Sequence, residues 1–277
     1  GPKDSKDLDL VEQTRAYIKS VSGFKSVKLI ERADNWGLAN NIIDGVTSIV
    51  NQYGKVIVLE DDLVVSPYFL KYMNEALDFY EKEELVVCIH GYVYPVKQKL
   101  PETFFIKGAD CWGWATWKRA WQNWDTSFAY LDDPEIVKRI HENIYPPKWA
   151  NFQIERAKKT REYYKKTGKV SSFELLNAMA MYLNSAYAII PTKNMISNVG
   201  ISEGSVHNVS DIKYVPKGMR RIFNMKTYEV ETEHIKHPKY MLENKTYQKK
   251  LFRIMGRNSG VKTFLWRVES KLRRMLL

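Results

Sequence analysis

The chain is poor in cysteine. Its 277 residues include only two, Cys88 and Cys111, and neither stands in the Cys/His spacing of a zinc site. Two thiols in or beside apolar segments are more typical of reduced core residues than of a disulfide framework. We therefore expect neither a disulfide scaffold nor a structural zinc site, and a reducing, cytoplasmic environment.

Long apolar runs, internal repeats and low-complexity tracts are missing as well. The sequence holds no run of about 18 apolar residues, and no signal peptide opens it. We expect a protein that is soluble or peripheral to a membrane. With 44% hydrophobic and 13% aromatic residues, the composition argues against disorder, and the length suffices for one large α/β domain.

Positive charge is present but unevenly distributed. The formal net charge is +11, and residues 211–277 hold 17 of the 43 Lys and Arg residues but only 6 of the 32 Asp and Glu residues. The rest of the chain is neutral overall. We predict a main domain over residues 1–212 and a basic extension over 213–277.

Helix and strand patterns alternate through about residue 92. Helical spacing of apolar residues occurs over 8–20 and 39–52, and apolar strand-like runs occur over 26–31, 55–60 and 85–92. Ser66 and Pro67 are typical of a helix start, and an apolar stripe follows them: Phe69, Leu70, Met73, Leu77 and Tyr80. The alternation predicts a doubly wound, mostly parallel sheet with helices on both faces.

Beyond residue 100 the patterns are less regular. We predict a tryptophan-rich helix over 113–124, charged helices near 134–143 and 149–166, a helix over 172–184, and a strand over 187–192.

Three consecutive carboxylates, Glu60, Asp61 and Asp62, follow the apolar strand "KVIVLE" and precede the next helix. In an open α/β sheet, ligands bind at the carboxyl ends of strands. Adjacent carboxylates repel one another unless a cation or hydrogen-bond donors offset the cost. Mg²⁺ and Mn²⁺ prefer such oxygen ligands and complete their shell with substrate phosphates. The triplet therefore predicts a metal-bound diphosphate, whereas the alternative is an acidic turn that only caps or solvates.

The context of the triplet resembles the GT-A glycosyltransferases, whose DxD-type motif is similar to "VIVLEDDLVVSPYFLKYMNEAL" in an EDD form. The likeness is to bacterial glycosyltransferase family 2 and to animal N-acetylglucosaminyltransferase I. Four further segments, within roughly residues 1–210, resemble motifs of these proteins in the same order: "ERADNWGLANNI", "ADCWGWATWKRAW", "SSFELLNAMAMYLNSAYAIIP" and "ISNVGISEGSVH".

The resemblance implies a GT-A type, Rossmann-like sheet and an inverting, metal-dependent transferase. The opening "GPKDSKD" is similar to the turn after the second GT-A strand, so the first strands are expected to be missing. We therefore expect this polypeptide alone to bind a donor poorly. The alternative for Gly1 and Pro2 is a remnant of a purification tag.

The same resemblance implies a metal site and a donor site. Asp62 is the expected ligand of Mn²⁺ or Mg²⁺, and His207 is a second ligand or a diphosphate contact; a surface loop histidine is the alternative. Glu60 and Asp61 are expected to hold the ribose and nucleotide of a nucleotide-sugar, for which a UDP-sugar is favoured. Asn35 and Gly37 could approach a phosphate or ribose at a helix start, or Asn35 could be a simple N-cap.

Arg32 could contact the nucleotide or be an ordinary surface arginine. An inverting transferase also needs a general base for the acceptor hydroxyl. The resemblance implies Glu174 for this role, in the place of an aspartate, with Asp110 as the competitor. An ordinary glutamate in the first turn of a helix is the alternative for Glu174.

Tryptophan faces stack on sugar rings, although tryptophans at helical spacing can equally be core residues. We expect Trp112 and Trp114 near the ligand, Gly113 between them to allow close approach of substrate, and Trp117 and Trp121 inside the protein.

The chain ends in a basic amphipathic pattern over residues 259–277, with Val261, Phe264, Leu265, Val268, Leu272 and Met275 on one helical face. This pattern is typical of an anchor on an anionic membrane surface. A helix docked on its own domain or on a homodimer partner is the alternative.

Taken together, we expect a transferase that is peripheral on the inner face of the cell membrane. It is expected to move a sugar, with the GlcNAc type as one candidate, to a hydroxyl of a lipid-linked or surface glycan. One alternative is a nucleic-acid-binding protein that uses the basic tail. Against it, the charge is confined to the tail and no RRM, KH or helix-turn-helix pattern occurs, so no nucleic-acid partner is expected. The other alternative is a catalytically silent scaffold on the GT-A fold.

Overall fold

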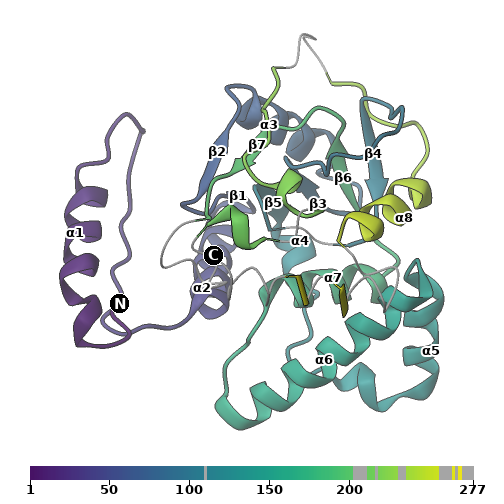
Figure 1. Ribbon diagram of the computed structural model, residues 1–277, viewed down its shortest axis with the longest axis horizontal. Helices are drawn as coiled ribbons and strands as arrows, with labels where there is room; N and C mark the ends of the chain where they lie inside the picture. The colour runs from purple at the N-terminus through teal and green to yellow at the C-terminus, as the bar shows by residue number, and fades with distance from the viewer. Residues whose placement is uncertain are drawn as a thin grey trace.

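A computed structural model of the chain describes residues 1–108, 111–201, 211–215, 218–229, 235–255, 264–265 and 268–269. Its helices are α1 Leu8–Lys19, α2 Leu38–Tyr53, α3 Phe69–Phe79, α4 Lys118–Trp121, α5 Pro134–Asn143, α6 Pro147–Thr167, α7 Phe173–Leu183 and α8 Lys245–Ile254. Its strands are β1 Lys55–Val58, β2 Leu63–Val65, β3 Val86–His90, β4 Thr103–Ile106, β5 Trp114–Trp117, β6 Tyr187–Pro191 and β7 Ile196–Asn198. Figure 1 shows their arrangement.

The main sheet is mixed, with the strand order β1-β5-β3-β6-β4. Only β3 and β6 pair in parallel, whereas the pairs β1–β5, β3–β5 and β4–β6 are antiparallel. The prediction of a mostly parallel sheet is therefore wrong. Helix–strand alternation ends at β3, because β4 and β5 follow it without an intervening helix of the kind that returns a chain to a parallel strand.

Helices cover both faces of this sheet. On one face, α3 packs through Phe69, Met73 and Leu77 against sheet residues that include Ile89 and Ile189. On the other face, α2, α4 and α7 contribute to a second core cluster, and α5 and α6 lie beyond α7 (Figure 1). Burial of these apolar side chains on two faces is the main stabilising contribution to the layered structure.

Two predicted elements differ in the structure. Residues 26–31 form no strand, and Val27, Leu29 and Ile30 are exposed, because no neighbouring strand pairs with them. The predicted helix over 113–124 is strand β5 followed by the short helix α4, because its aromatic and β-branched residues pair with both β1 and β3 in the sheet.

The start of α3 lies slightly later than the sequence predicts. Ser66 caps a turn there, since its Oγ accepts a hydrogen bond from the Tyr68 backbone N–H at 3.2 Å, and α3 begins at Phe69. Leu70 is exposed, and Tyr72 takes a buried place in the apolar stripe instead.

Much of the described chain beyond residue 212 packs against the main body. Ile222, Ile235, Tyr247 and Phe252 are buried, and the Tyr92 hydroxyl donates to the Ile222 carbonyl at 2.9 Å. This segment adds no named strand to the sheet, although Glu243 forms a β-bridge with Phe105. By contrast α1 has no buried residue, and it lies to one side of the body (Figure 1).

Candidate active site

The carboxyl ends of β1 and β3 lie on either side of the start of β5. Trp114 is the register partner of both Val58 and His90, and the Gly91 N–H donates to the Gly113 carbonyl at 2.9 Å. The loops at 59–62, 91–93 and 111–113 therefore meet at one edge of the sheet. This is the edge at which the sequence predicts a ligand.

Asp62 is held at this edge by a segment more than 130 residues away in sequence. Strands β2 and β7 pair, with Leu63 opposite Asn198, and the Val199 N–H donates to the Asp62 carbonyl at 2.9 Å. The Asn198 amide Nδ2 lies 3.4 Å from Asp62 Oδ2. A Cβ atom on Gly200 would lie 1.9 Å from the same oxygen, so the glycine backbone lies directly against the carboxylate.

The acidic triplet is a turn between two strands, not the lead-in to a helix. The Leu63 N–H donates to the Glu60 carbonyl at 3.3 Å, and β2 stands between the triplet and α3. Asp61 is exposed, whereas Glu60 and Asp62 are half-buried. The three carboxylates of the turn therefore differ in their exposure to solvent.

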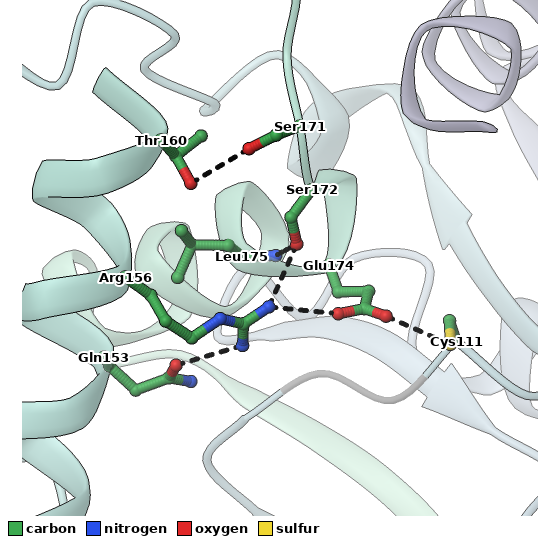
Figure 2. Close-up of polar contacts among 8 residues, drawn as sticks. All are labelled: Cys111, Gln153, Arg156, Thr160, Ser171, Ser172, Glu174 and Leu175. Atoms are coloured by element: carbon green, nitrogen blue, oxygen red, sulfur yellow. Dashed lines mark hydrogen bonds and ion pairs between the residues drawn. The ribbon is translucent and has the colours of Figure 1, made fainter. Parts of the chain in front are cut away.

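Glu174 lies in the first turn of α7, whose N-cap is Ser172. One carboxylate oxygen, Oε1, accepts from the Cys111 thiol at 3.6 Å, and the other, Oε2, lies 3.3 Å from Arg156 Nη2 (Figure 2). Because Cys111 directly precedes Trp112, Glu174 lies beside the loop that enters β5. The structure therefore brings Glu174 to the edge where β1 and β3 end.

Arg156 and Gln153, both on α6, are site residues that the sequence did not predict. Arg156 Nη1 donates to the Gln153 side-chain oxygen at 3.2 Å, and Nη2 donates to Ser172 Oγ at 3.1 Å (Figure 2). Gln153 is itself buried. The spacing of residues on a highly charged helix does not predict the contact between Arg156 and Glu174, which are 18 positions apart. Only the packing of α6 on α7 reveals this contact.

The three residues of the predicted tryptophan motif have different surroundings. Trp112 is half-buried and meets the ring of Tyr92 edge to face at 4.8 Å between centroids. Trp114 is 1% exposed and stacks on Trp121 and Phe173, so it lies in the core and offers no face to a ligand. The prediction that Trp114 lies near the ligand is therefore wrong, because its side chain is buried in the core beside β5.

Gly113 is required for the packing of the loop that enters β5. Its φ is +64°, which side-chain-bearing residues rarely adopt, and a Cβ atom there would lie 2.5 Å from Ile196 Cδ1. Ile196 and Phe69 therefore fill the side of Gly113 on which a side chain would stand.

Arg32, Asn35 and Gly37 lie around the start of α2. Asn35 Oδ1 accepts from the Gly37 N–H at 2.8 Å, and Arg32 pairs with Asp44 and stacks over Trp36 at 4.0 Å. Helix α2 leads into β1 through Gly54, so its N-terminus faces the carboxyl edge of the sheet.

The N-terminus of α2 also lies close to the segment that leads into α7. Asn40 Nδ2 donates to the Val170 carbonyl, and the Val170 N–H donates to Asn40 Oδ1, both at 3.2 Å. The link brings the starts of α2 and α7 together.

The competitor base Asp110 and the second predicted metal ligand, His207, lie outside the described residues. Within the described ranges, no group of three His, Cys, Asp or Glu side chains is arranged to hold a metal ion. A cavity of about 420 Å³ lies elsewhere, between β4 and residues 238–246, and none of the predicted site residues lines it.

His90, at the end of β3, is buried below the candidate site. Burial disfavours its charged form and lowers the pKa of the imidazole to about 3. The side chain is therefore neutral at physiological pH and adds no positive charge to the edge at which the acidic triplet lies.

No protein-family model matches the chain, and no curated protein matches its sequence.

Proposed function

We propose that this protein is an inverting, metal-dependent glycosyltransferase of the GT-A type that uses a nucleotide-sugar donor. The observation that carries the proposal is the convergence of four segments on one sheet edge. Asp62 lies there against Asn198 and Gly200, and Glu174 lies beside Cys111. These contacts join four of the motifs that resemble glycosyltransferases, although the motifs are far apart in sequence.

In the proposed reaction, an acceptor hydroxyl oxygen attacks the anomeric carbon of the donor sugar. The bond between that carbon and the diphosphate oxygen breaks, and the nucleotide diphosphate leaves with the bonding electron pair. Glu174 takes the hydroxyl proton as the new glycosidic bond forms. Trp112 lies next to Cys111 and supplies an aromatic surface at the same edge.

The donor chemistry at Asp62 fits Mn²⁺ or Mg²⁺, which commonly use one or two protein carboxylates together with substrate phosphates. Asp62 is half-buried and backed by the Gly200 backbone, and His207 is the proposed second ligand. A metal bound there would supply positive charge for the departing diphosphate. Glu60 and Asp61, on the same turn, are proposed to contact the ribose and nucleotide.

The acceptor is proposed to be a hydroxyl of a lipid-linked or surface glycan, reached from the inner membrane face. Among the described residues, no helix combines the length and apolar character needed to cross a bilayer. A peripheral contact through residues 259–277 is the proposed means of attachment.

The test is release of UDP from UDP-sugars by the protein in the presence of Mn²⁺. Asp62→Ala should lower release by about 100-fold or more, since loss of a metal ligand removes several kcal/mol of stabilisation from the departing diphosphate. Asp78→Asn, which removes an exposed carboxylate paired with Lys55 on the opposite side of the fold, is the control and should change release by less than about twofold. Binding of a UDP-sugar without release would instead identify a silent sugar-binding relative.

A further inference from the structure

Arg156 makes more contacts than a surface ion pair requires. Its guanidinium reaches Gln153, Ser172 and Glu174 at 3.1 to 3.3 Å (Figure 2). Gln153 is 3% exposed, so one side of the guanidinium is bound to a buried and fixed amide. In the other described ion pairs of α6, Lys158, Arg161 and Lys165 are each paired with one exposed carboxylate.

The contact with Ser172 fixes Arg156 to the start of α7. Ser172 Oγ also accepts from the Leu175 N–H as the N-cap of that helix. One hydroxyl therefore links the guanidinium to the helix that carries Glu174. The planar guanidinium group of arginine suits this position, because its N–H donors point in fixed directions and can bind several acceptors at once.

Glu174 is bound at both of its oxygens. Arg156 binds Oε2 and Cys111 donates to Oε1, so the carboxylate spans the distance between α6 and the loop before Trp112. A glutamate in the first turn of a helix otherwise has several rotamers open to it. With the guanidinium in place, Oε1 is directed toward the 111–113 loop.

We propose that Arg156 is a positioning residue, which holds the Glu174 carboxylate against the 111–113 loop so that Oε1 meets the acceptor hydroxyl. This inference rests on the proposed function, because it assigns Arg156 a part in the same reaction. The direct contact with substrate belongs to Glu174, and Arg156 acts through it.

Kinetics give the first test. Arg156→Met should lower kcat by about 10- to 100-fold and change the donor KM by less than about twofold, since displacing a reacting group by about 1 Å can cost a factor of that size. Arg156→Lys should recover part of the loss. Arg161→Met, on the same helix and also paired with a carboxylate, is the matched control and should leave kcat unchanged.

A double variant separates positioning from a structural role. If Arg156 acts only through Glu174, Arg156→Met in a Glu174→Gln background should lower kcat no further. A full additional loss in the double variant would overturn the proposal.

Alkylation of Cys111 by iodoacetamide tests the arrangement without any substrate. The thiolate is the reactive form, and a nearby carboxylate disfavours it, so Glu174→Gln should accelerate alkylation several-fold. Cys88 is fully buried and does not compete. If Arg156 holds the carboxylate in place, Arg156→Met frees it and accelerates alkylation as well.

The opposite result would overturn the proposal. If the carboxylate stays beside Cys111 without Arg156, loss of the cation leaves the thiolate less favoured, and alkylation is unchanged or slower. Faster alkylation in a chain that releases no UDP would uphold the positioning of Glu174 and refute the proposed reaction.

Discussion

At the scale of single residues, Gly200 occupies a position at the candidate site that leaves no room for a side chain. Its Cα carries no side chain on the side that Asp62 occupies, and a Cβ atom there would approach both Cγ and Oδ2 of that residue to less than 3 Å. A methyl group can fit only if the aspartate leaves its contact with Asn198.

Gly200→Ala should therefore lower the free energy of unfolding by about 1–3 kcal/mol, the usual cost of overpacking, and should impair Mn²⁺-dependent UDP release. Urea unfolding measures the first effect. Gly45→Ala is the control, because no atom lies within 4 Å of its added methyl group and it lies inside α2, where alanine should stabilise by about 0.5–1 kcal/mol. Equal stability of Gly200→Ala and the wild-type chain would contradict the contact.

Residue types predicted part of this site. The carboxylate triplet and Glu174 stand out because like charges and a helix-start glutamate have recognisable neighbours in sequence. Trp114 was misassigned, since an aromatic residue has the same letter whether it faces a ligand or stacks on Trp121 in the core. Arg156 was missed because its three partners come together only when α6 and α7 pack.

At the scale of elements, β3 carries a buried ionisable group into the centre of the sheet. His90 has an ordinary pKa near 6.5 in the unfolded chain and one of about 3 in the folded protein. Between these values the unfolded chain binds a proton that the folded protein does not. The stability is therefore complete above pH 6.5 and falls as the pH is lowered toward 3.

The free energy of unfolding should fall by up to about 1.4 kcal/mol per pH unit from this group alone. His90→Gln, which cannot bind a proton in this range, should show a shallower decline between pH 7 and pH 4 in urea unfolding curves. His141→Gln, partly exposed on α5, controls for the removal of a histidine. Parallel declines for the wild-type chain and His90→Gln would refute the assignment.

Most long helices were predicted close to their observed bounds, because apolar spacing and caps are local signals. The prediction failed for residues 26–31 and 113–124, where a strand depends on its partner. The first segment has strand-like residues but no neighbouring strand, and the second has helical tryptophan spacing but two neighbouring strands. Strand direction likewise depends on the connection between strands, which periodicity does not encode.

At the scale of the whole molecule, the basic charge and the site are separate features. The main body is neutral, and the described residues near the C-terminus that belong to the apolar face, Phe264, Leu265 and Val268, are exposed. The rest of the proposed membrane-binding pattern lies outside the described residues.

Deletion of residues 259–277 should abolish flotation of the protein with anionic vesicles while leaving the body folded. A second variant, with Lys271, Arg273 and Arg274 changed to Gln, keeps the apolar face and should weaken binding by about 100-fold, since each such charge contributes about 1 kcal/mol near the surface. Undiminished flotation of the deleted chain would exclude this anchor.

The pairing of β2 with β7 determines when, during synthesis, the turn that bears Asp62 can reach its folded arrangement. Among the described residues, β7 is the partner that β2 pairs with, and it is made more than 130 residues later. Such a distant contact forms slowly, because a long loop must close first. During synthesis, the turn that bears Asp62 therefore reaches its folded arrangement only after residues 196–200 have emerged, and the metal binding proposed for Asp62 would be acquired as one of the last steps of folding.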